Sequence, residues 1–150
     1  MRFRIHTSYL AVAVLFALAR VATFAESPFT YGLIRGSCAP WDGPAIEVTL
    51  TKSPVQCARV AGPYISIGVW RGLPIHAGQT VKFGSGSDAG FASRCVKEGD
   101  CERAESGSIV FEKYEEGLGA RGRYELHFKG GQTITGSFGA RWCQTRVVCG

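Results

Sequence analysis

The chain has 150 residues, of which 45% are hydrophobic and 19% charged, and its formal net charge is +5. After the first 25 residues this length fits one domain with a real core. No low-complexity tract, fixed-period repeat or dividing linker interrupts it, so we expect a single domain over residues 26–150.

Residues 1–25 have the layout of a secretory signal peptide. Two arginines near the start supply a positive end, and the apolar run Leu10–Ala19 follows. The small residues Thr23 and Ala25 then precede an expected mature start at Glu26. The run is shorter than the ~20 apolar residues that a bilayer span needs, so we expect no stable membrane span after signal removal. An apolar helix docked on the domain is the alternative, but such a helix should show one apolar stripe.

Removal of the signal peptide changes the charge argument. Three of the 17 basic residues lie within it and none of the 12 acidic ones does, which leaves 14 against 12 and a net charge of +2. No Lys/Arg-rich run alternates with aromatic residues in the remainder. Nucleic acid is therefore not an expected partner.

The cysteine content predicts disulfides. An even number of cysteines behind a secretory signal indicates three bridges, with several possible connectivities. We expect a local Cys95–Cys101 bridge, and Cys38 joined to Cys143 or Cys149; a local Cys143–Cys149 bridge is the alternative for the C-terminal pair. No C-x-x-C motif and no nearby histidine supports a metal site, so neither a metal nor a cofactor is expected. The six cysteines are Cys38, Cys57, Cys95, Cys101, Cys143 and Cys149.

Short segments of alternating polarity, bounded by Gly, Pro, Ser and Asp, predict β-strands. The segment of residues 63–70 carries Tyr64 and Trp70 on its otherwise polar face, which indicates a central strand covered on both sides. We expect an all-β fold, an antiparallel sandwich or small barrel of roughly seven or eight strands, ending in a hairpin or meander and stapled by disulfides. The segments are residues 45–51, 63–70, 78–83, 90–95, 107–114, 122–128 and 133–142.

The last two segments predict a hairpin with an odd-length loop. If Phe128 and Ile134 both face the core, pairing them leaves residues 130–132 as the connection. A two-residue Gly-Gly turn would turn one polar face inward, because a slip of one residue inverts every side chain. A three-residue loop or a bulge is therefore required.

The polar face of this hairpin carries the residue types of a hydrolytic triad. In the predicted register Ser137 lies opposite Glu125, and His127 opposite Thr135. A nucleophile–base–orienter arrangement uses these types, but mid-strand positions offer no turn to present the serine and no oxyanion hole. We therefore expect a solvated face, no catalytic residue and a protein that is not an enzyme.

The aromatic residues and one glycine-rich connection suggest a binding site. Trp41 and Trp70 are candidate ligand contacts, because exposed rings in a row stack on sugars, with core packing as the alternative. Asp88 joins them as a candidate contact, since it stands among small residues in a segment that lacks both glycine-rich phosphate-binding patterns.

Acidic residues cluster around Cys95 and Cys101. A calcium site uses several oxygen ligands, but the EF-hand spacing is absent, and a charged turn closed by a disulfide explains the same residues. These residues are Glu98, Asp100, Glu102 and Glu105.

Together these observations predict a secreted protein, extracellular or periplasmic, that acts by binding or structure rather than by catalysis. Its expected partner is a protein or glycan of the envelope or the extracellular space. One alternative is a secreted inhibitor that uses the Cys95–Cys101 loop as a pre-organised contact. A carbohydrate-binding module is the other.

Overall fold

The computed structural model describes residues 28–58 and 60–150; the expected signal peptide lies outside them. The described residues form nine strands and one 3₁₀ turn, and none of them forms a helix long and apolar enough to span a membrane. The strands are β1 Tyr31–Cys38, β2 Pro44–Thr51, β3 Tyr64–Val69, β4 Gln79–Gly84, β5 Gly90–Lys97, β6 Asp100–Arg103, β7 Ser106–Glu115, β8 Gly119–Phe128 and β9 Gln132–Trp142.

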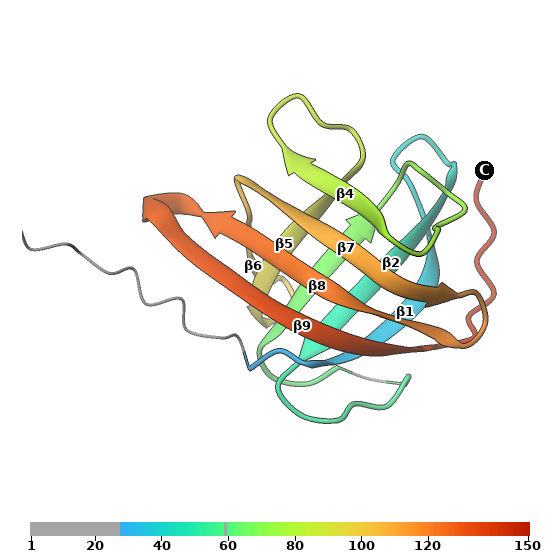
Figure 1. Ribbon diagram of the computed structural model, residues 1–150. Helices are drawn as coiled ribbons and strands as arrows, with labels where there is room; N and C mark the ends of the chain where they lie inside the picture. The colour runs from blue at the N-terminus through green and yellow to red at the C-terminus, as the bar shows by residue number, and fades with distance from the viewer. Residues whose placement is uncertain (1–27, 59) are drawn as a thin grey trace, which may run out of the picture.

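All nine strands belong to one curled sheet in the order β4-β7-β8-β9-β1-β2-β3-β5-β6. In Figure 1, β7, β8 and β9 cross over β1, β2 and β5, and the core lies between the two halves of the curl. The all-β, disulfide-stapled fold is thus confirmed. Two details were wrong: the sheet has nine described strands, and β1 pairs with β9 in parallel, so the sheet is mixed rather than wholly antiparallel.

The core follows the predicted alternation. Ile46, Val48 and Leu50 of β2 face inward, and each is 5% exposed or less. The even-numbered positions of β8 and β9 are likewise buried at Tyr124, Leu126, Phe128, Phe138 and Ala140. Burying one large aliphatic or aromatic side chain stabilises a fold by about 1.5–3 kcal/mol, so this alternation selects which face of each strand turns inward.

The β8–β9 hairpin has the predicted three-residue loop, but one position earlier in the chain. The loop is Lys129–Gly131, and Leu126 rather than Phe128 lies opposite Ile134. Gly130 and Gly131 both have φ of 78°, a conformation that glycine adopts at little cost. Gln132 is extended and begins β9. Because the register differs by two residues, the same faces remain buried.

The three disulfides are Cys38–Cys149, Cys57–Cys143 and Cys95–Cys101. The local bridge and the link from Cys38 to the C-terminal segment are confirmed. Cys38–Cys149 joins the end of β1 to the C-terminal segment, and Cys57–Cys143 joins the β2–β3 loop to the residue after β9. Two hydrogen bonds reinforce this arrangement: Arg141 Nη2 donates to the Val55 carbonyl at 2.7 Å, and the Cys143 amide donates to the Ile34 carbonyl at 2.7 Å.

Candidate functional site

The candidate site lies on the outer face of the sheet, by which we mean the side of β1, β2, β3, β5 and β6 that faces away from the core. Strand pairing sets its side chains in rows across the strands. In one row Arg35 lies beside Glu47, and Glu47 beside Gly68. Gly68 in turn lies beside Phe91 of β5. This row thus crosses four neighbouring strands, β1, β2, β3 and β5.

Three aromatic rings form a ring strip at one end of this face: Trp41, Trp70 and Phe91. Trp41 stands in the β1–β2 turn, and its ring centroid is 6.0 Å from that of Trp70, which follows β3. The centroids of Trp70 and Phe91 are 5.5 Å apart. Trp41 is 48% exposed, whereas the other two rings are half-buried. The ring strip therefore runs from two half-buried rings to one that is half exposed to solvent.

Charged side chains flank the ring strip. The guanidinium of Arg71 lies 4.9 Å from the centre of the Trp41 ring, and its Nη2 is 2.6 Å from an Asp88 carboxylate oxygen. The three candidate contacts from the sequence, Trp41, Trp70 and Asp88, are therefore brought together. Arg71 links them and was missed, although it directly follows Trp70 in the chain. The loops that carry them lie along the upper part of Figure 1.

Phe91 is positioned by a glycine. A Cβ built on Gly68 would lie 2.3 Å from the Phe91 ring, so the ring covers the glycine directly. A glycine within a strand often marks such a close approach. The ring thus packs on the sheet backbone with its opposite face turned away from the sheet. The Arg103 guanidinium lies 6.0 Å from its centre.

A polar pocket of about 230 Å³ lies on the same outer face. Glu47 forms its centre and its side chain is only 21% exposed. Arg35 donates from Nε at 3.0 Å and from Nη2 at 2.7 Å to Glu47 Oε2, while Ser66 Oγ donates at 2.8 Å to Oε1. Three hydrogen bonds, two of them from a cation, hold this carboxylate fixed in place.

Tyr64 forms the end of the polar pocket farthest from the ring strip. Burial raises the pKa of its phenol, and the negative charges of Glu98 and Glu47 raise it further, against the opposing effect of Arg35. The phenol therefore stays protonated at neutral pH and offers both a donor and an acceptor. The disulfide Cys57–Cys143 and the Glu98 side chain complete the walls.

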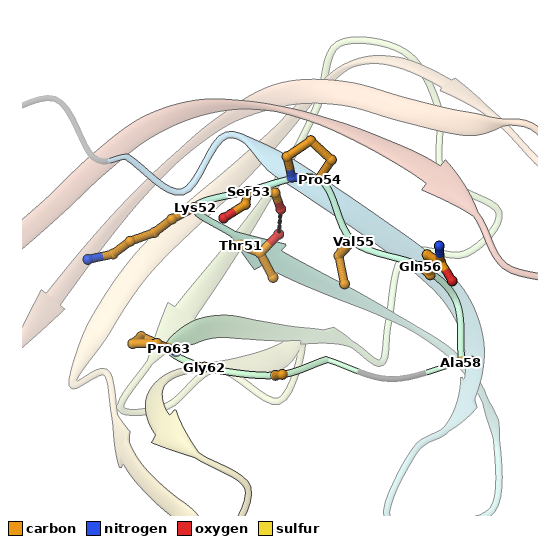
Figure 2. A pocket seen from close by; sticks show the side chains of 10 residues that line it. Thr51, Lys52, Ser53, Pro54, Val55, Gln56, Ala58, Gly62 and Pro63 are labelled. Atoms are coloured by element: carbon orange, nitrogen blue, oxygen red, sulfur yellow. Dashed lines mark hydrogen bonds between the residues drawn. The ribbon is translucent and has the colours of Figure 1, made fainter.

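A second hollow on the described surface has a different character. It measures about 520 Å³ and lies within the β2–β3 loop, between Thr51 and Pro63. Figure 2 shows the loop encircling open space, with the Lys52 side chain directed away from it and a hydrogen bond from Thr51 Oγ1 to the Ser53 carbonyl at 2.7 Å. Lys52 is the single charged side chain among its described lining residues. The hollow thus lacks converging polar groups, unlike the polar pocket.

The polar face of β7, β8 and β9 does not assemble the triad considered from the sequence. His127 Nε2 is 2.9 Å from Glu125 Oε1, and its Nδ1 is 3.0 Å from Thr133 Oγ1, so both ring nitrogens are engaged. The predicted pairs were wrong by two residues: Ser137 lies opposite Arg123, and His127 opposite Thr133. At about 3.3 Å per residue, Ser137 is roughly 13 Å along the sheet from His127.

The acidic residues near the local disulfide are dispersed. Glu102 accepts a hydrogen bond from Arg94 Nε at 2.7 Å, and Glu98 lines the polar pocket. Among residues 28–58 and 60–150, no three His, Cys, Asp or Glu side chains gather as a metal site requires.

Comparisons with protein-family models, curated proteins and solved structures yielded no match to this chain. The functional argument therefore rests on the geometry of the outer face.

Proposed function

We propose that this protein is an exported, non-enzymatic binding protein that takes carbohydrate on the ring strip. The observation that carries the proposal is the position of Trp41, which is half exposed yet contacts both the Trp70 ring and the Arg71 guanidinium. Three disulfides are typical of proteins outside the cytoplasm. Together with the signal-like residues 1–25, they support export to the periplasm or the extracellular medium.

The chemistry of sugars matches this surface. A pyranose has a face of C–H groups, which packs on the electron-rich face of an aromatic ring. Its hydroxyls need donors and acceptors at the ring edge, and Arg71 and Asp88 supply both beside Trp41. A side chain already held in place loses little conformational entropy when a ligand binds. The ring strip therefore combines stacking, hydrogen bonding and pre-organisation.

A glycan array followed by calorimetry tests the proposal. The wild-type protein should retain at least one glycan class, and Trp41→Ala should weaken that binding by about tenfold or more, as expected for a central aromatic contact. Tyr31→Ala is the matched control, since Tyr31 is 46% exposed but lies outside the ring strip. A wild-type protein that retains no glycan, or a Trp41→Ala variant that binds as tightly as Tyr31→Ala, would refute the proposal.

A second candidate function is inhibition of another protein through the β5–β6 hairpin. The Cys95–Cys101 disulfide closes this hairpin, and Val96 beside it is 66% exposed. A rigid loop that presents an apolar side chain suits a protein contact. Inhibition of any member of a panel of secreted proteases by the wild type, lost in Val96→Asp, would favour this function. Equal inhibition by both proteins, or by neither, would count against it.

A further inference from the structure

We propose that the glycan is recognised by its chain end, with the terminal sugar unit in the polar pocket and the following units along the ring strip. This inference rests on the proposed carbohydrate binding and adds to it the class of ligand, a free chain terminus rather than an internal segment.

Gly68 links the ring strip to the polar pocket. The Phe91 ring lies over Gly68, and Gly68 is the direct cross-strand neighbour of Glu47. Side chains opposite each other on paired strands stand about 4.5–5.5 Å apart at Cβ. The last ring of the strip therefore adjoins the carboxylate at the centre of the pocket, and a ligand stacked on the rings would reach it next.

The pocket is bounded by side chains on the side away from the ring strip. From Gly68 to Tyr64 along β3 is roughly 13 Å at the usual rise per residue. There the Tyr64 ring and the Glu98 side chain form a wall, while the Cys57–Cys143 disulfide bounds the pocket over β1. A glycan that enters from the ring strip meets these walls and cannot continue as an extended chain.

The pocket size suits one sugar unit. Its volume of about 230 Å³ lies below the ~300–1,000 Å³ of sites that enclose larger organic ligands. The ring strip outside it accounts for further units, because its three rings follow one another at centroid spacings of 6.0 and 5.5 Å.

The polar groups in the pocket suit the hydroxyls of a chain end. Arg35 uses two donors on Glu47 and retains others, and Tyr64 offers a phenol that both donates and accepts. A terminal sugar has a free hydroxyl where an internal sugar has its next glycosidic bond. A site built to hydrogen-bond a hydroxyl strongly rejects a ligand that lacks it. The walls of the pocket and its hydrogen-bonding groups therefore both favour a terminal sugar over an internal one.

The stoichiometry of binding tests the inference. The probes are linear gluco-oligosaccharides with α-1,4, β-1,4 or β-1,3 linkages, and chito-oligosaccharides, each from two units up to the polymer, together with any array-positive glycan prepared at several lengths. In a series that binds, calorimetry should give one protein per chain at every length. A number of bound proteins that rises with chain length would overturn the inference.

Two variants separate this inference from the proposed function. Glu47→Gln keeps the size of the side chain but removes its charge, and Ser66→Ala removes one donor; each should weaken oligosaccharide binding at least about tenfold, the size of a central contact. Urea unfolding of both variants checks that the fold survives. If Trp41→Ala loses binding while folded Glu47→Gln and Ser66→Ala bind as the wild type does, chain-end recognition fails and the proposed function stands. If no glycan binds the wild type, both fail.

Discussion

Removal of the long-range disulfides should reveal that they are coupled. Cys38–Cys149 and Cys57–Cys143 are nested, with sequence separations of 111 and 86 residues. Taken alone, loops of this length stabilise a fold by about 4.6–4.8 kcal/mol in the chain-entropy account. With one bridge intact, the other closes only the path through residues 38–57 and 143–149. That path has about 25 residues, so either bridge should contribute only about 3.5 kcal/mol.

We therefore expect Cys38→Ala/Cys149→Ala and Cys57→Ala/Cys143→Ala each to lower the free energy of unfolding by about 3.5 kcal/mol. Removing both bridges should lower it by about 8 kcal/mol, more than the two single effects together. The assay is urea unfolding without reductant, followed by tryptophan fluorescence. If the four-alanine variant is unfolded in buffer, a stabilising osmolyte restores a measurable transition.

The Cys95–Cys101 bridge provides the control, since its separation of six residues makes it a local loop. Its removal should cost about 2 kcal/mol and should add to the effect of either long-range removal. The nesting argument is refuted if the double removal costs no more than the sum of the single ones.

Two further predictions concern single positions. A Cβ on Gly122 would lie 1.9 Å from the Val110 carbonyl oxygen, whereas one on Gly139 would meet nothing within 4 Å. Gly122→Ala should therefore destabilise the protein by about 1–3 kcal/mol, whereas Gly139→Ala should be neutral or slightly stabilising. Similar urea midpoints for the two variants would contradict the β7–β8 packing. The raised pKa of Tyr64 means that the folded state holds the phenol proton more tightly than the unfolded state, whose value is near 10.0. This contribution to stability is complete below about pH 10 and is lost as the pH rises through the folded pKa. Between pH 8 and about pH 11, the Tyr64→Phe variant should therefore lose less stability than the wild type. Equal losses in the two proteins would speak against the environment assigned to Tyr64.

The sequence determined the local features of this protein. Alternation with a period of two residues identified the buried faces of β2, β3, β8 and β9, because a strand directs successive side chains to opposite sides. The same pattern required an odd-length loop in the β8–β9 hairpin. It left the register open by two residues, since a shift of two preserves every buried position. The short spacing of Cys95 and Cys101 likewise predicted their bridge.

Only the tertiary structure decided which strands are neighbours. The alternation of β1 is broken by Gly32 and Gly36, so it was not predicted as a strand, and its parallel pairing with β9 joins the first and last strands of the described sheet. In the sequence, Glu47 occupies a polar position of an alternating segment, as any solvent-facing residue would. In the structure, a disulfide-tethered loop and the neighbours that hydrogen-bond to Glu47 make it the centre of a pocket. Trp41, Trp70 and Asp88 stand in three separate connections, and they meet because β1, β2, β3 and β5 are neighbours in the sheet. Alternation is a property of one strand, whereas these contacts are formed between strands when the whole chain packs around its core.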